Sequence, residues 1–360
     1  MGYYVNPAGP VPIDPLTILY IMEAPYALYG DKVVLLAMAG RETGQETGFR
    51  ILMSIGRSGS SYLPIGRSSM FNQHGVLAVA YPETASQIDE DVGITIDFDD
   101  FGLSAIETIT RDGLMGLQNM GLLVRSYTSL AGVKGFKEEL ISFETVTPIT
   151  TTRLKLEGVY RGRFDTEIQA WPVGSHFLYL GSTQYTKIES RDFVVNNQRF
   201  FKFVPHSNSL GSQVDEALPY IHTISGRAFR PLPPTNFAGN GSSKCGMYDD
   251  AGDVVLTWKG RTRAAGAGMQ ERQSVPVAQA WEGTFTIYVY DYWSPSQPGH
   301  LKDTITGVNA LTYTYDAAAI TAAFGSHPAA MAFVLENTRT GTDGHTYTSE
   351  KVSITMEKRI

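Results

Sequence analysis

The chain of 360 residues has a formal net charge of −7, with 42% hydrophobic and 18% charged residues. Above about 250–300 residues a single core stops growing, so the length predicts several domains. The acidic balance argues against nucleic-acid binding, and Lys and Arg form no polybasic run that would bind an anionic membrane. No apolar run approaches the ~20 residues that span a bilayer, so we expect no membrane insertion and synthesis as a soluble protein in the cytoplasm.

The residue types favour strands over helices. The chain contains 36 Gly, 18 Pro, 19 Tyr and 17 Phe, which is typical of strands joined by turns. Cys245 is the only cysteine, so no intramolecular disulfide can form, and its neighbours supply no base that would make it a nucleophile. We therefore predict a mainly β protein with several small β domains in series.

The first predicted segments are an arm and a β domain. Residues 1–16 carry four prolines, which predict an extended N-terminal arm. Residues 17–82 are expected to form the first β domain, in which a hairpin over 50–66 has Gly59 in its turn. Pro64 is then expected on an edge strand or at a bulge, because it has no backbone N–H to donate.

A domain boundary is predicted at Tyr81–Ser86, and residues 83–226 are assigned to a second β domain or domains. Within this part, residues 93–98 alternate between apolar and polar side chains, which predicts a strand. Residues 103–121 favour a short helix at most, because three glycines argue against a long one.

A second boundary lies at the proline-rich segment 226–237. The remaining part, 227–360, has short strands at regular spacing and an inward-facing Trp258, which predict a fibronectin type III-like β-sandwich. Asp316 and Gly325 flank a run of good helix formers, so one or two helical turns are expected between them.

An acidic segment invites three interpretations. Its spacing does not match the ligand positions of an EF-hand loop, and a glycosidase pair would need two carboxylates held across a sugar-binding cleft. We interpret the segment as a solvated surface loop, with a structural cation site and a catalytic pair as the alternatives. The side chains concerned are Asp89, Glu90, Asp91, Asp97, Asp99 and Asp100.

The histidines give no metal-binding pattern. No two have the i, i+4 spacing of a helical zinc site, and no cysteine pair accompanies them. We therefore predict no metal site, no cofactor and no catalytic residue, and we interpret each histidine as a surface or half-buried side chain. The seven are His74, His176, His206, His222, His300, His327 and His345.

The segment Tyr288–Trp293 is rich in aromatic residues, and Tyr292 and Trp293 lead into a polar loop. One interpretation is packing in the sandwich core with the tyrosine hydroxyls at its rim. The other is an exposed contact for a receptor or for sugar rings, because exposed aromatic side chains stack on sugars and anchor protein interfaces.

A strand is predicted to end in the turn Arg161-Gly162-Arg163. Gly162 is expected to adopt a left-handed backbone angle there, since glycine adopts positive φ without steric cost. We expect one of the two arginines to pair with a carboxylate that follows in the chain. The candidate partners are Asp165 and Glu167.

Several blocks in a fixed order resemble the C-terminal region of the tail-tip (baseplate hub) proteins of long-tailed phages and gene transfer agents. The resemblance extends from about residue 17 to the C-terminus. It makes Arg161, Gly162, Arg163 and Glu167 a family-signature turn with a structural role. The blocks lie at 121–124, 139–143, 156–167, 226–234 and 253–263.

The resemblance implies a structural virion protein without enzymatic activity, made in the host cytoplasm and located at the tail tip. The implied partners are other copies in a homotrimer, further tail-tip proteins (hub, tube or fibre) and a host surface receptor. Longer family members carry a glycoside-hydrolase-like barrel ahead of this region, so we expect the chain to correspond to their C-terminal portion. The alternatives are a receptor- or carbohydrate-binding module that uses Tyr292 and Trp293, and an envelope glycan-degrading enzyme that uses the acidic segment 89–100.

Overall fold

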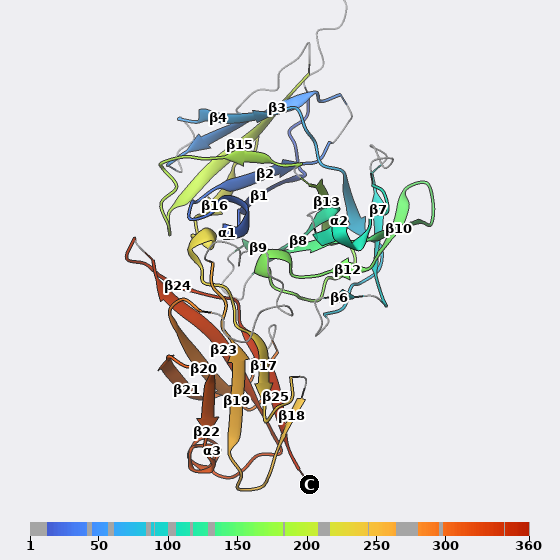
Figure 1. The fold of residues 1–360 in the computed structure, drawn as a ribbon. Helices are drawn as coiled ribbons and strands as arrows, with labels where there is room; N and C mark the ends of the chain where they lie inside the picture. The colour runs from blue at the N-terminus through green and yellow to red at the C-terminus, as the bar shows by residue number, and fades with distance from the viewer. Residues whose placement is uncertain are drawn as a thin grey trace, which may run out of the picture. The chain divides into compact units, whose positions relative to one another are not determined.

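The chain folds into two compact units that consist mainly of strands (Figure 1). The first unit takes the chain up to residue 24 and residues 33–226, and the second takes residues 25–32 and 227–360. The predicted mainly β fold is therefore confirmed, whereas residues 1–12 of the predicted arm, and Gly59, lie outside the described residues. The computed structural model describes residues 13–41, 45–56, 61–83, 88–89, 91–99, 106–115, 118–128, 134–182, 184–207, 217–243, 245–263, 280–294, 298–341 and 343–359.

The first unit contains a nine-stranded sheet that curls into a barrel. Only Gly158, at a φ of +59°, separates β11 from β12, yet the two strands lie near opposite ends of the row. One chain segment thus borders both β7 and β9, and the enclosed core includes Ile96, Leu123 and Phe177. The order is β10 (Thr145–Pro148), β11 (Arg153–Glu157), β7 (Ile94–Phe98), β5 (His74–Leu77), β13 (His176–Gly181), β8 (Met120–Thr128), β9 (Lys134–Ser142), β12 (Val159–Tyr160) and β6 (Ile88–Asp89).

Two smaller sheets in the first unit share a second apolar core, which includes Ile21, Leu35 and Phe201. Pro64 lies on an edge strand, beside a bulge at Ile65 of the same strand, as predicted for a residue without a backbone N–H. The three-stranded sheet has the order β1 (Leu19–Glu23), β2 (Leu35–Ala39) and β14 (Thr186–Ile188), and the four-stranded sheet has the order β16 (Tyr220–Thr223), β15 (Gln198–His206), β3 (Gly48–Ser54) and β4 (Leu63–Ser68).

The structure differs from the predicted division between 17–82 and 83–226. Strand β5 precedes that boundary but pairs with β7 and β13, which follow it. In the same way β2 pairs with β14, and β3 pairs with β15. The proline and small polar residues at 81–86 mark a turn in one interlaced unit, because strand pairing rather than loop composition decides which segments fold together.

The second unit is a two-sheet sandwich around a core that includes Trp258, Phe285 and Phe333. Its strand order is that of a fibronectin type III-like sandwich, as predicted, and Trp258 points inward with 4% of its surface exposed. One sheet has the order β17 (Thr235–Gly239), β19 (Val254–Lys259) and β22 (Thr312–Tyr315), and the other has the order β18 (Cys245–Tyr248), β25 (Val352–Lys358), β23 (Ala330–Thr340), β20 (Thr284–Tyr290) and β21 (Leu301–Val308), with β24 (Thr346–Thr348) beside β23.

The described helices are short. Helix α3 (Ala317–Phe324) begins where Asp316 accepts a hydrogen bond from the Ala319 amide at 2.7 Å, and it ends at Gly325 in the left-handed region, as predicted. Among the described residues, no helix is both long and apolar enough to cross a membrane. The other helical segments are α1 (Tyr26–Tyr29), α2 (Arg111–Met115) and the 3₁₀ turns η2 (Arg163–Asp165) and η3 (Arg227–Phe229).

Candidate functional site

The first arginine of the Arg-Gly-Arg turn forms a buried ion pair in the barrel. Arg161 follows β12 and Glu139 lies on β9, and neither side chain is exposed to solvent. The guanidinium donates to the carboxylate twice, from Nη2 to Oε2 at 2.7 Å and from Nε to Oε1 at 2.9 Å. Of the two arginines, Arg161 thus pairs with neither Asp165 nor Glu167, because strand pairing brings it a carboxylate from 22 residues upstream.

The same two side chains contact two further segments, residues 81–82 and 169–171. Arg161 also donates to the carbonyl oxygens of Pro82, at 2.5 Å, and Gln169, at 2.6 Å. Glu139 accepts from the indole N–H of Trp171 at 2.6 Å, and the Tyr81 ring lies 4.2 Å from the guanidinium carbon. A buried ion pair is stabilising only when its remaining hydrogen-bonding groups are satisfied, and these contacts satisfy them. We call Arg161, Glu139, Trp171 and Tyr81 the buried lock.

The other residues of the turn also adopt conformations or make contacts that belong to the fold. Gly162 has a φ of +59°, which confirms the predicted backbone angle. Arg163 is buried, donates to the Leu114 carbonyl at 3.2 Å and lies over the Tyr160 ring. Glu167 is exposed on the surface of the first unit.

Replacing Gly162 with alanine is expected to lower the free energy of unfolding of the first unit by more than about 1–2 kcal/mol, the cost of a left-handed angle for an L-residue. The added Cβ would lie 2.8 Å from Ile168 Cγ1 and 2.9 Å from the Thr166 carbonyl. Gly174→Ala is the matched control, because Gly174 has a φ of +81° and open space around a Cβ. Urea unfolding of both variants measures the difference, and equal losses would contradict a role for the close contacts.

The acidic segment is not one solvated loop. Asp89 is buried and accepts from the Tyr81 hydroxyl at 2.6 Å and from the backbone amides of residues 91–93. Asp97 pairs with Arg153 at 2.5 Å on the outer surface. The surface-loop interpretation was therefore wrong for Asp89, because the tyrosine and the turn amides compensate its desolvation. Glu90 and Asp100 lie outside the described residues.

Asp89 makes the first unit acid-sensitive. Burial raises the pKa of this carboxyl, but the hydrogen bonds from Tyr81 and from the amides of residues 91–93 lower it more, so the net pKa lies below its ordinary value. Its contribution to stability is therefore complete above the unfolded pKa of about 3.9 and is lost as the pH falls through the lower folded value. We expect Asp89→Asn to show a smaller loss of unfolding free energy between about pH 6 and pH 3 than the wild type. Asp14→Asn, at an exposed carboxylate, is the control.

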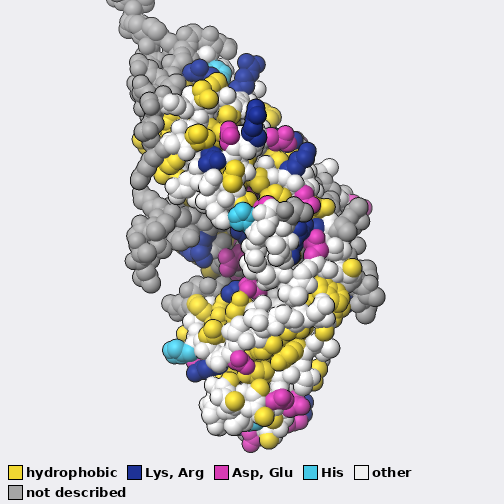
Figure 2. Space-filling model, turned by 90° about the vertical axis from the view of Figure 1, so that its left-hand side faces the viewer, with side chains coloured by type: hydrophobic (Ala, Val, Ile, Leu, Met, Phe, Trp, Pro, Cys, Tyr) yellow, Lys and Arg dark blue, Asp and Glu magenta, His cyan; other side chains and the backbone are white. Residues whose placement is uncertain are grey.

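The aromatic segment lies at the outer face of the second unit rather than in its main core. Tyr292 is 55% exposed, and Trp293 is partly buried against Tyr290, with the ring centres 4.8 Å apart. The Lys351 ammonium lies 5.4 Å from the Trp293 ring centre and 4.7 Å from that of Tyr288. Figure 2 shows apolar side chains gathered on one face of this unit, with charged side chains at its margins.

The loop that carries Tyr292 and Trp293 is closed at its base by a carboxylate. Asp291 accepts from the backbone amide and from Nδ1 of His300, each at 2.8 Å, and from the Tyr292 amide at 2.9 Å. The hydrogen bond from His300 is the main cause that lowers the pKa of Asp291. Tyr292 and Trp293, the two predicted contact residues, therefore follow a turn that is held by three hydrogen bonds to Asp291.

Two of the histidines, which no sequence pattern links, lie side by side in the barrel. His74 Nε2 lies 2.9 Å from His176 Nδ1, and His74 Nδ1 lies 2.7 Å from the Asp99 carboxylate. His74 and His176 are 102 residues apart, and only the pairing of β5 with β13 brings them together. A local sequence pattern cannot predict which distant strands will pair in this way.

Within the described ranges, no group of three or more His, Cys, Asp or Glu side chains is placed to hold a metal ion. Cys245 is a free, exposed thiol. Desolvation, followed by the nearby Glu357 carboxylate, raises its pKa, which makes it a poorer nucleophile at neutral pH. These contacts agree with the interpretation of Cys245 as a bystander.

Comparison with known proteins relates part of the barrel to a family. Residues 72–178 match the family described as Rcc01698-like, C-terminal. This is a gene-transfer-agent-associated family. The matched segment covers less than a third of the chain and runs from just before β5 into β13. It contains the buried lock and the His74–His176 pair.

The other comparisons add little. No curated protein matches the chain. Among solved structures, the FN1–FN3 domains of chicken CNTN1 align over 96% of this chain and 100% of theirs, at 10% identity and a TM-score of 0.20. A TM-score this low supports no conclusion about the fold of the whole chain, so the fibronectin type III-like assignment of the second unit relies on its strand order.

Proposed function

We propose that the chain is a structural, non-enzymatic protein of the tail tip of a phage or gene transfer agent, where it takes part in tail assembly and host attachment. The observation that carries the proposal is the match of residues 72–178 to a gene-transfer-agent-associated family. The ordered blocks at 226–234 and 253–263 extend the resemblance to tail-tip proteins beyond that segment.

The proposed setting is the virion, with synthesis in the host cytoplasm. The proposed partners are two further copies in a homotrimer, other tail-tip proteins (hub, tube or fibre) and a host surface receptor. The barrel supports a mechanical role in the tail, since the core strands of a fold open locally only at a high free-energy cost. The buried lock supports it further, because it ties β9 to the turn after β12 and to residues 81–82 and 169–171.

Deletion of the gene from the producing genome tests the proposal. Particles made without the chain are expected to lack part of the tail tip in negative-stain images and to deliver no DNA, and expression from a plasmid is expected to restore both. Particles that keep a complete tip and deliver DNA normally would contradict it.

A second candidate function, a receptor- or carbohydrate-binding module of the tail tip, is favoured by the exposure of Tyr292 beside the partly buried Trp293. Removing a central aromatic anchor costs about 2 kcal/mol or more of binding energy, so Trp293→Ala is expected to reduce adsorption of particles to host cells at least tenfold. Leu301→Ala, at a 52% exposed residue of β21, is the control. Unchanged adsorption of the Trp293 variant would leave this outer face with a structural role only.

A further inference from the structure

The four-stranded sheet of the first unit is cationic, although the chain as a whole is acidic. Strands β16, β15, β3 and β4 contain no Asp or Glu. The formal net charge of the whole chain is −7, so this sheet is opposite in sign to the rest of the protein. Its basic side chains are those of Arg50, Arg67, Arg199, Lys202, His206 and His222.

Two of these arginines face each other across neighbouring strands. Arg50 on β3 is the register partner of Arg67 on β4, so the two side chains project from the same face of the sheet. Phe49 and Ile51, on either side of Arg50, lie in the apolar core. Arg50 therefore points to the solvent, and both arginines are exposed. We call Arg50 and Arg67 the arginine pair.

The arginine pair has no counter-charge. Within the described part of the chain, neither of its side chains forms an ion pair or a hydrogen bond. By contrast, Arg153 and Arg161 of the same unit each pair with a carboxylate. Like charges that lie directly opposite each other destabilise a sheet, so the arginine pair costs stability unless an anion lies between the guanidinium groups.

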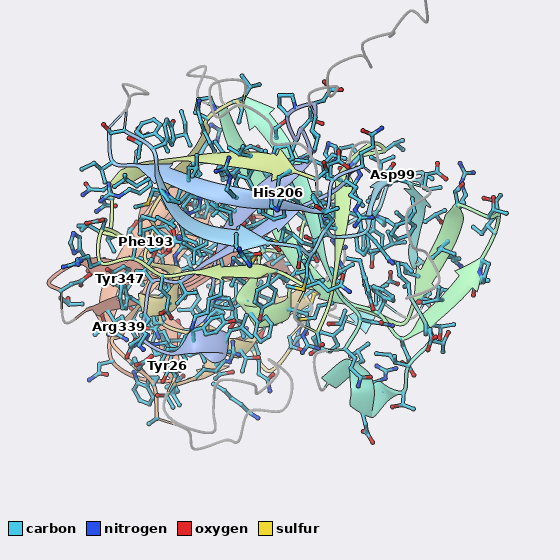
Figure 3. All side chains as sticks on the ribbon, turned by 90° about the horizontal axis from the view of Figure 1, so that it is seen from above. Tyr26, Asp99, Phe193, His206, Arg339 and Tyr347 are labelled. Carbon is cyan, nitrogen blue, oxygen red and sulfur yellow. The ribbon has the colours of Figure 1, made fainter. Side chains whose placement is uncertain are left out.

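A histidine lies beside the arginine pair. His206, labelled in Figure 3, ends β15 and is the register partner of Gly48, two residues from Arg50 on β3. Its ring covers the backbone there, because a Cβ at Gly48 would lie 2.9 Å from His206 Cε1. Burial, followed by the nearby Arg50 and Arg67, lowers the pKa of His206. The positive field of both arginines thus reaches this ring.

We propose that the arginine pair binds a phosphate group of a ligand on the solvent face of the four-stranded sheet, with His206 beside it. Guanidinium groups form paired hydrogen bonds with the oxygens of both phosphate and carboxylate. Charge selects between the two, because a phosphate monoester carries about −1.5 to −2 at pH 7 and balances two arginines, whereas a carboxylate balances one. The site goes beyond the structural function proposed above, which does not require it.

Calorimetric titration of the full-length protein with inorganic phosphate, at an ionic strength held constant with sodium chloride, tests the site. Arg50→Ala and Arg67→Ala are each expected to weaken phosphate binding at least about tenfold, because hydrogen bonds between ionised groups are the strong ones. Arg153→Ala is the matched control and is expected to leave the affinity unchanged, since the half-exposed Arg153 already has Asp97 as its partner.

Two further ligands identify the chemical class. Acetate, a monoanion, is expected to bind at least about tenfold more weakly than phosphate, because it balances only one of the two charges. Glucose 6-phosphate distinguishes a phosphate group on a larger molecule from the free ion, and it is expected to bind as tightly as inorganic phosphate because the arginine pair is exposed. Binding of the free ion alone would overturn the assignment to a larger ligand.

Arg67→Glu separates loss of the site from loss of the fold. It places a carboxylate opposite Arg50, so it is expected to abolish phosphate binding and to raise the midpoint of urea unfolding, because opposite charges across two strands stabilise a sheet. The proposal would be overturned by a wild type that does not bind phosphate, by unchanged affinity in the Arg50 and Arg67 variants, or by acetate that binds as tightly as phosphate.

Discussion

Glu139→Gln is expected to destabilise the first unit by about 3–5 kcal/mol, because it leaves the buried Arg161 without a counter-charge. Glutamine keeps the shape of the side chain, so the loss reports charge and hydrogen bonding rather than a cavity. It also replaces a carboxylate that accepts from Arg161, Trp171 and the Gly162 amide. Urea unfolding, followed by tryptophan fluorescence, to which Trp171 contributes from the first unit, measures the change.

Two further variants test whether the loss comes from the uncompensated charge of the buried ion pair. Asp97→Asn breaks the half-exposed pair with Arg153 and is expected to have little effect, because exposed ion pairs contribute little to stability. The double variant Glu139→Gln/Arg161→Met removes both charges and is expected to be more stable than Glu139→Gln alone. A Glu139→Gln loss as small as that of Asp97→Asn would show that the buried lock does not stabilise the barrel.

Phe285→Ala is expected to destabilise the second unit by about 3–5 kcal/mol, the usual cost of removing a large buried aromatic side chain. Phe285 is fully buried on β20, and its ring centre lies 5.3 Å from that of Trp258 and 6.0 Å from that of Trp281. The loss therefore includes the aromatic contacts as well as the cavity. Thermal unfolding by calorimetry measures it.

The same experiment examines whether the two units unfold separately. Phe285→Ala is expected to lower the transition of the second unit and to leave that of the first unchanged, since the substituted side chain packs in the core of the second unit. Leu301→Ala, at an exposed side chain of the neighbouring strand, is expected to change stability by less than about 0.5 kcal/mol. Equal effects of the two substitutions would contradict the placement of Phe285 in the core.

Local sequence patterns correctly predicted the structural features that depend only on neighbouring residues, such as a strand, a helix cap and a turn conformation. The alternation at 93–98 became β7, the cap at Asp316 and the stop at Gly325 bracket α3, and Gly162 has the expected positive φ. The proline-rich segment at 226–237 lies where the second unit resumes at Arg227. Each of these depends on side-chain size, capping or turn chemistry within a few residues.

The features that the sequence did not predict depend on pairing between strands that lie far apart in the chain. The closure of the barrel depends on β11 and β12 bordering strands at opposite ends of the row. The same pairing selects Glu139 as the partner of Arg161 and brings His74 to His176. Residues that follow an arginine closely look like its natural partners, but only the strand register determines which carboxylate reaches it.

The location of the chain in assembled particles tests the proposed function most directly. We would label an epitope at the C-terminus and image purified particles by cryo-electron microscopy with gold-conjugated antibody. We expect gold at the tail tip, with three copies per particle in the reconstruction. Particles that carry DNA and a complete tail but no label, or label only on the head, would contradict it.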